Sequence, residues 1–293
     1  MRKRIIFGGL TILALVMLFW FDLLWGGYFV CLVAMALTAA ALHELFAMTK
    51  KMDLQPFRLT GIAFGAALLP YYLWSDDFLN RLLGSQAFVA FIMAPLFALI
   101  LALMGRACTR RDGLGPQFKN IAVTVFGVLY VALPMAFLVR TRFLTGEGWD
   151  LVLLVIAVAK AGDSGAYFTG VTLGRHKLAP RVSPNKTVEG AVGGLVASML
   201  AALAMVYLLN IGLLIPRGPV AILSFGLVVG VAAQAGDLTE SLIKRSAEIK
   251  DSGRMLPVLG GVLDLIDSLL VAAPVAYFVL ATFAEVARKL GEG

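Results

Sequence analysis

Long apolar runs dominate this chain and restrict the folds that it can adopt. Nine stretches have the length that a membrane-spanning helix needs, roughly 17 to 25 residues. They lie near residues 5–21, 27–48, 59–74, 86–104, 120–139, 151–170, 189–211, 219–236 and 258–283. We therefore predict an all-α, polytopic membrane protein with about nine transmembrane helices.

Composition supports this interpretation, because 60% of the 293 residues are hydrophobic and only 15% are charged. No segment outside the apolar runs is long enough to bury a core of its own. We predict a single integral membrane domain, with N-terminal membrane helices in residues 1–150 and C-terminal helices in 151–293 that carry the polar motifs. The first run lacks a small-residue cleavage site, so we expect it to be a retained anchor.

The distribution of basic residues predicts the orientation in the membrane. If the N-terminus is cytoplasmic, 18 of the 25 Lys and Arg residues lie on the cytoplasmic side, 6 lie opposite, and Lys160 lies within a span. The positive-inside rule favours this arrangement. We predict a multi-pass protein of the cell (inner) membrane, with the polar segments 171–190 and 236–257 facing the cytoplasm.

Several classes of partner and chemistry are disfavoured. The net charge of +7 is spread over loop ends without interleaved aromatic residues, so we expect no nucleic-acid partner. Cys31 and Cys108 have no metal-ligand spacing. The two histidines, His43 and His176, belong to no wider metal set, which argues against acid–base chemistry centred on histidine.

Polar residues are dense between Gln234 and Ser268, although apolar spans flank this stretch. Charged groups next to a bilayer are costly and indicate a functional site. Helical spacing places four of the polar residues on one face: Asp237, Glu240, Ser241 and Lys244. Such oxygen ligands suit a hard cation. The alternative is an amphipathic extension with a surface ion pair between Glu240 and Lys244.

Two more aspartates, Asp264 and Asp267, are three residues apart at the head of the last span. One interpretation is structural: acidic residues in the first turn of a helix interact favourably with its dipole, which stabilises the helix by under about 1 kcal/mol. Unpaired carboxylates near hydrocarbon are otherwise avoided, which favours a metal site. Lys160 and Asp163, three residues apart in the sixth span, are predicted either to form a structural buried pair or to contact the substrate.

Two segments can bind phosphate. In the first, Ser183 caps a predicted helix with Pro184 in its first position, so that Lys186 and Thr187 lie beside free backbone amides. In the second, residues 250–254 combine a turn with two cations. The alternatives are simple helix capping and an ordinary surface turn.

These motifs together resemble the phosphatidate cytidylyltransferase, or CDP-diacylglycerol synthase, family. The resemblance covers roughly residues 163–268 and rests on their order: S-P-N-K-T-V-E-G from Ser183, G-D-L-T-E-S-L-I-K-R from Gly236, K-D-S-G from Lys250, and the paired glycines before Asp264 and Asp267. It implies transfer of CMP from CTP to phosphatidic acid, which gives CDP-diacylglycerol and pyrophosphate.

The resemblance also implies roles for individual residues. The catalytic residues would be Asp237, Lys250, Asp251 and Asp264. The substrate-binding residues would be Ser183, Asn185, Lys186, Thr187, Glu189, Glu240, Ser241, Lys244 and Arg245. The metal ligands would be Asp237, Asp264 and Asp267, holding Mg²⁺ with room for a second cation. The implied partners are CTP, phosphatidic acid and membrane lipid, and a homodimer is compatible with the sequence.

Two positions depart from the family's usual pattern. Leu259 stands where histidine is common, and Leu265 stands where arginine is common. Two other functions use similar groups: a CTP-dependent lipid or polyprenol kinase, and a cation-coupled or proton-coupled transporter that relays charge through the intramembrane acids.

Overall fold

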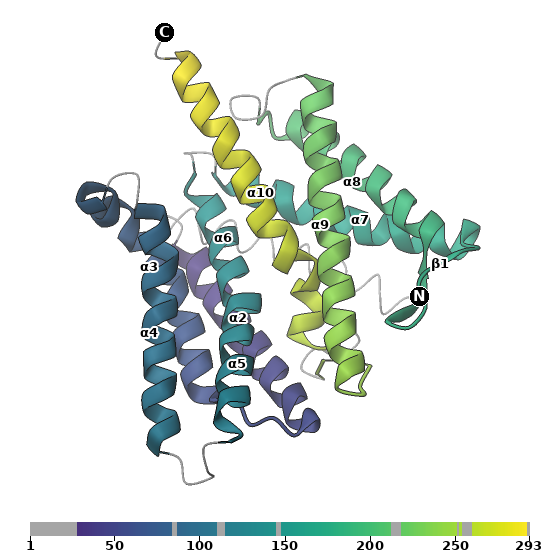
Figure 1. Cartoon of the computed structure of the whole chain (residues 1–293). Coiled ribbons are helices and arrows are strands. Elements are labelled where there is room, and N and C mark those ends of the chain that lie inside the picture. The colour runs from purple at the N-terminus through teal and green to yellow at the C-terminus, as the bar shows by residue number, and fades with distance from the viewer. Residues whose placement is uncertain are drawn as a thin grey trace. The chain divides into compact units, whose positions relative to one another are not determined.

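The structure is a computed structural model of the chain (Figure 1). It describes residues 28–83, 87–109, 115–144, 148–211, 218–250, 252–253 and 260–291, with the side chains of 72–91 and 287–291 left aside. The predicted span at 5–21, and also Asp251 and Leu259, lie outside the described residues. The all-α fold class is confirmed, and a short hairpin is the one sheet in the described part.

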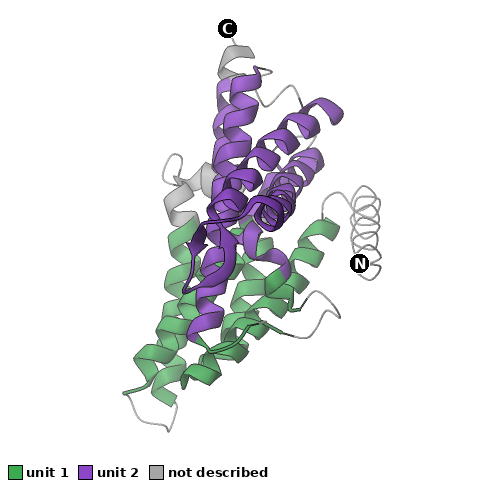
Figure 2. Ribbon diagram, turned by 90° about the vertical axis from the view of Figure 1, so that its right-hand side faces the viewer, with its two compact units in different colours: residues 1–136, 247–264 green, residues 137–246, 265–293 purple. Residues whose placement is uncertain are grey.

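Two compact units divide the chain (Figure 2). Unit 1 comprises residues 1–136 and 247–264, and unit 2 comprises 137–246 and 265–293. The chain therefore leaves unit 1, forms most of unit 2, returns to unit 1 and ends in unit 2. The prediction of a single membrane domain divided near residue 150 stays a prediction.

Unit 1 is built from helices α2 (Tyr28–Thr49), α3 (Arg58–Leu83), α4 (Ala87–Thr109) and α5 (Gln117–Gly127). A 3₁₀ turn, η1 (Lys50–Met52), ends α2, and a π-helical segment, η3 (Val128–Ala132), joins α5 to α6 (Leu133–Arg142). The buried side chains Leu42, Leu45 and Phe46 recur at helical spacing along α2. Because lipid is as apolar as these side chains, their burial gives little hydrophobic stabilisation in a membrane. They stabilise the fold through close packing.

Unit 2 contains α7 (Gly148–Leu173), the strands β1 (Lys177–Ala179) and β2 (Ser183–Thr187), α8 (Val188–Leu208), α9 (Pro219–Ser246) and most of α10 (Val262–Gly291). Small residues let α7 and α8 approach closely. A Cβ atom at Gly165 would lie 3.0 Å from the carbonyl oxygen of Gly193, and one at Gly162 would lie 2.5 Å from Ser198 Oγ. This close contact fixes the helix from which Lys160 and Asp163 project.

Seven helical segments in the described residues are long and apolar enough to cross a membrane. They are Tyr28–Met52, Ile92–Thr109, Gln117–Arg142, Gly148–Leu173, Val188–Leu208, Pro219–Ser246 and Val262–Val286. The prediction of a polytopic membrane protein is confirmed, and the number nine stays a prediction.

The predicted helix start at Ser183 is wrong. Residues Ser183–Thr187 form β2, which pairs antiparallel with β1, and α8 begins at Val188. Thr187 is the cap: its backbone is extended, with φ −122°, and its hydroxyl accepts a hydrogen bond from the amide of Gly190 at 3.1 Å. Pro184 fixes a φ value that an extended strand also accepts, so the Ser-Pro pair did not require a helix.

Candidate metal and phosphate site

Three carboxylates meet in unit 2, and we call Asp237, Glu240 and Asp267 the carboxylate cluster. One ligand oxygen from each lies within 4.8 Å of the others. Glu240 is fully buried, and Asp267 is 9% exposed. Three acidic groups this close repel one another unless cations compensate them. The cluster is therefore suited to hold a divalent cation.

Helix geometry explains why these acids meet. Asp237 and Glu240 are three residues apart on α9 and share a face, while Asp267 comes from α10. Gly236 allows the two helices to approach, because a Cβ atom there would lie 2.5 Å from the carbonyl oxygen of Asp267. The glycine before Asp237 thus brings the two aspartates together.

Lysine side chains surround the carboxylate cluster. Lys186 Nζ lies 2.6 Å from Asp237 Oδ2, and Lys244 Nζ lies 2.5 Å from Glu240 Oε2. The bland alternative for Glu240 was a surface ion pair, but its carboxylate is fully buried. A buried charge is stable only with such partners. The ion pair between Glu240 and Lys244 is consequently part of the site and is not a surface ion pair.

The predicted pair between Lys160 and Asp163 is present and extends to the cluster, but the two side chains are 37% and 33% exposed and the pair is not buried. Lys160 Nζ lies 3.2 Å from Asp163 Oδ2 and 4.0 Å from Asp267 Oδ1, and it donates to Ser268 Oγ at 2.9 Å. Ser268 Oγ in turn donates to Asp163 Oδ2 at 3.1 Å. Lys160 therefore places a positive charge near Asp267, at a distance too long for a hydrogen bond, and so offsets part of the negative charge of the cluster.

A cavity of about 560 Å³ opens beside the cluster within unit 2. Its polar lining includes Asp163, Lys177, Asn185, Lys186 and Asp237. Binding cavities for small molecules are commonly about 300 to 1,000 Å³. Three residues predicted to bind substrate, Asn185, Lys186 and Thr187, thus line one cavity with the predicted metal ligand Asp237.

The hairpin that carries Lys186 is fastened to the helices around it. Glu189 accepts hydrogen bonds from the backbone amides of Arg175 at 3.0 Å and His176 at 3.1 Å, and it lies 2.6 Å from His176 Nδ1. Arg245 Nε donates to the carbonyl oxygen of Val182 at 3.2 Å. Glu189 and Arg245 were predicted to bind substrate, and the contacts described here hold the hairpin.

The remaining predicted residues lie elsewhere. Ser183 is at the start of β2, outside the cavity, and Ser241 is half-buried on α9. Lys250 and Asp264 belong to unit 1. Asp264 Oδ2 accepts hydrogen bonds from the amides of Ser252 and Gly261 and from the Ser252 hydroxyl, at 2.8 to 3.1 Å. Its predicted metal role stays a prediction, and Glu240 joins the candidate ligands instead.

Sequence reasoning gave no role to Glu44, a buried acid near the C-terminal end of the apolar α2. Its carboxylate accepts hydrogen bonds from the amides of Val262 at 3.0 Å and Leu263 at 2.9 Å, and from the Ser252 hydroxyl at 3.2 Å. Glu44 therefore caps the start of α10 from a distant helix. Its place in an apolar run was the available signal.

We expect Glu44→Gln to lower the free energy of unfolding by about 2 kcal/mol. The amide group of glutamine turns a donor toward one of the two backbone amides, which then loses its acceptor. Thermal unfolding in detergent measures the effect, with an expected fall in Tm of about 5 °C. The neighbouring, exposed His43→Gln is the matched control. Equal Tm values for the two variants would show that Glu44 does not hold α10.

Comparison with known proteins shows the family to which the chain is similar. The chain matches the model of the cytidylyltransferase family over residues 2–283. It is 32% identical over 286 residues to a phosphatidate cytidylyltransferase of Bacillus subtilis (strain 168), which covers 97% of this chain and 98% of the relative. It is 30% identical over 272 residues to the protein of the same name in Staphylococcus haemolyticus (strain JCSC1435), covering 92% and 97%. The Staphylococcus aureus (strain COL) protein is 37% identical over 164 residues, 56% of this chain and 60% of the relative.

Proposed function

The chain belongs to the cytidylyltransferase family, and on that premise we propose that it is a phosphatidate cytidylyltransferase. It transfers CMP from CTP to phosphatidic acid and so serves phospholipid biosynthesis. The observation that carries the proposal is the contact between Lys186 and Asp237 in a cavity beside three clustered carboxylates. Transfer between two phosphate anions needs a cation-binding group and fixed positive charge in one place.

The reaction does not need a strong general base. The phosphate monoester of phosphatidic acid has a second pKa of about 6, so an anionic oxygen is available near neutral pH. That oxygen bonds to the α-phosphorus of CTP, the bond from the α-phosphorus to the bridging oxygen breaks, and pyrophosphate leaves. Positioning and charge compensation supply the catalysis. A chain with two histidines is compatible with this chemistry.

The carboxylate cluster fits Mg²⁺, because hard cations prefer carboxylate oxygens and three of them lie within 4.8 Å. Bound Mg²⁺ would offset the negative charge of the phosphates. Lys186 exchanges its partner Asp237 for a phosphate oxygen of the substrate. Lys244 keeps Glu240 in position, and Lys160 offsets part of the negative charge near Asp267.

Labelled CTP tests the function directly. We expect label at the α-phosphate to enter the lipid when the purified protein receives phosphatidic acid and Mg²⁺, and label at the γ-phosphate to leave in pyrophosphate. Chelation of the metal is the control and abolishes both. Entry of the γ-label into lipid would show a kinase, and absence of label from every lipid product would remove the enzymatic proposal in favour of transport.

The cytoplasmic orientation is part of the proposal, supported by the excess of Lys and Arg on the predicted cytoplasmic side. The same assay tests it in sealed vesicles, since CTP does not cross a bilayer. Inside-out vesicles should label their lipid from external CTP, whereas right-side-out vesicles should not. The opposite pattern would reverse the orientation.

A further inference from the structure

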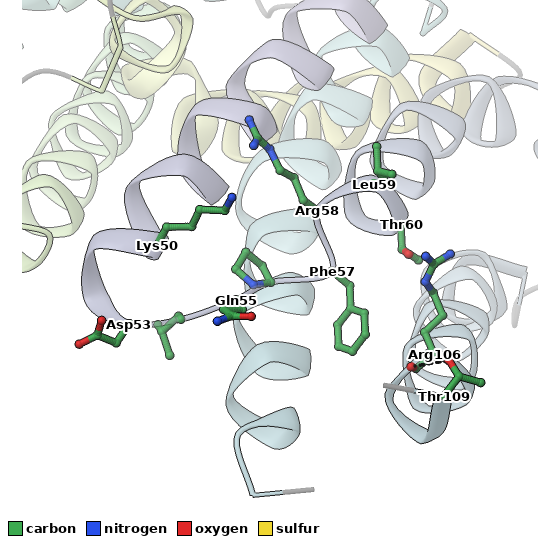
Figure 3. A pocket seen from close by; sticks show the side chains of 11 residues that line it. Lys50, Asp53, Gln55, Phe57, Arg58, Leu59, Thr60, Arg106 and Thr109 are labelled. Carbon is green, nitrogen blue, oxygen red and sulfur yellow. Dashed lines mark hydrogen bonds between the residues drawn. The ribbon is translucent and has the colours of Figure 1, made fainter. Parts of the chain in front are cut away.

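Unit 1 contains a cavity of about 960 Å³ that the proposed reaction does not use. Three basic residues line it: Lys50 in η1, Arg58 at the start of α3 and Arg106 near the end of α4. Figure 3 shows them coming from three separate stretches of the chain. We call this cavity the basic pocket. None of the residues of the carboxylate cluster lines it.

The positive charge in the basic pocket is not paired with a carboxylate among the described residues. Lys50, Arg58 and Arg106 form no ion pair in the part of the chain that the structure describes. Asp53 is the one acidic residue in the described lining. Three cations and a single carboxylate in the lining leave a net positive charge, which attracts an anion.

Hydrogen bonds to buried side chains of α5 hold one wall of the basic pocket, the segment between α2 and α3. The amide of Gln55 donates to Asn120 Oδ1 at 2.8 Å, and the amide of Phe57 donates to Thr124 Oγ1 at 2.9 Å. Both acceptors are buried polar side chains on α5, 4% and 0% exposed. The positive-inside rule explains basic residues at a loop, but it does not require two buried side chains to fix that loop. The segment between α2 and α3 is thus preorganised.

The first turn of α3 also lines the basic pocket. Arg58, Leu59 and Thr60 are the first three residues of α3, and a helix N-terminus favours an anion. Within the described residues, Thr60 Oγ1 is buried without a hydrogen-bond partner. Buried hydroxyls usually have a partner. The Thr60 hydroxyl is closed to solvent, so a ligand in the basic pocket would meet the three cations and the first turn of α3 and not this hydroxyl.

We propose that the basic pocket binds a phosphate group of a ligand, with Arg58, Arg106 and Lys50 as its cationic contacts. Guanidinium groups match the oxygens of phosphate in geometry, and charge-assisted hydrogen bonds are the strong ones. The phosphate comes from an anionic lipid headgroup or from a soluble phosphate compound. The proposal does not depend on the proposed reaction, because the two sites share no residue.

Binding measurements on the full-length protein in detergent test the basic pocket. The probes are short-chain phosphatidic acid, glycerol 3-phosphate and inorganic phosphate, with short-chain phosphatidylcholine as the control for the acyl chains. We expect wild-type protein to show two classes of site for phosphatidic acid. Arg58→Gln combined with Arg106→Gln should weaken one class at least tenfold. Lys186→Gln should weaken the other.

The probes also identify the source of the phosphate. Loss of phosphatidic acid binding alone, with no site for the two soluble probes, supports a lipid headgroup. Comparable loss for glycerol 3-phosphate or inorganic phosphate supports a soluble ligand. Lys119→Gln, an exposed lysine on α5 outside the basic pocket, is the control variant and should bind like wild type. Unchanged binding of every probe by the double arginine variant would overturn the proposal.

Discussion

An Asp237→Asn variant is expected to lose about a thousandfold in kcat/KM, which corresponds to about 4 kcal/mol of transition-state stabilisation. Asp237 combines three roles that no other described residue combines: it belongs to the carboxylate cluster, lines the cavity of unit 2 and pairs with Lys186. Asparagine keeps the size of the side chain but removes the charge that a divalent cation requires.

Two readouts separate a metal role of Asp237 from a structural one. The Mg²⁺ concentration for half-maximal activity should rise in Asp237→Asn, while the Tm of the protein without metal should not fall. Glu248→Gln removes an exposed acid just beyond α9 and should behave like wild type in both. An unchanged Mg²⁺ requirement together with near-normal kcat/KM would exclude Asp237 as a ligand.

A Lys186→Gln variant is expected to lose about a hundredfold in kcat/KM, because one fixed cation at the phosphates is removed. Its Mg²⁺ requirement should not rise, in contrast to that of Asp237→Asn. Lys186 lies 2.6 Å from Asp237, so its loss leaves that carboxylate more available to a cation. The Mg²⁺ concentration for half-maximal activity should therefore stay constant or fall.

Substitutions around Lys186 sharpen this test. Lys186→Arg keeps the positive charge and should recover part of the lost activity. Arg181→Gln removes an exposed cation from the turn of the same hairpin, outside the cavity, and should leave kcat/KM unchanged. Equal losses in Lys186→Gln and Arg181→Gln would mean that general positive charge matters and a specific contact at position 186 does not.

Local spacing explains which parts of the site were predictable. Lys160 and Asp163 are three residues apart on one helix, so their pairing follows from helix geometry alone, and it is present at 3.2 Å. Asp237 and Glu240 share a face for the same reason. Their proximity to Asp267, in contrast, depends on how α9 packs against α10, with Gly236 at the contact.

Longer-range structure explains the errors and omissions. Ser183 and Pro184 have the local chemistry of a helix start, yet pairing between β1 and β2 places them in a strand and moves the cap to Thr187. The sequence around Glu44 does not reveal its partners. They lie more than two hundred residues away, at Ser252, Val262 and Leu263.

The carboxylate cluster is tested most directly by a crystal structure of the protein grown with Mn²⁺, which replaces Mg²⁺ at oxygen sites and is located by its anomalous scattering. We predict a Mn²⁺ peak bonded to carboxylate oxygens of Asp237, Glu240 and Asp267, at about 2.0 to 2.3 Å. A Mn²⁺ ion held by other residues, with none at this cluster, would contradict the assignment of the catalytic cation to these three acids.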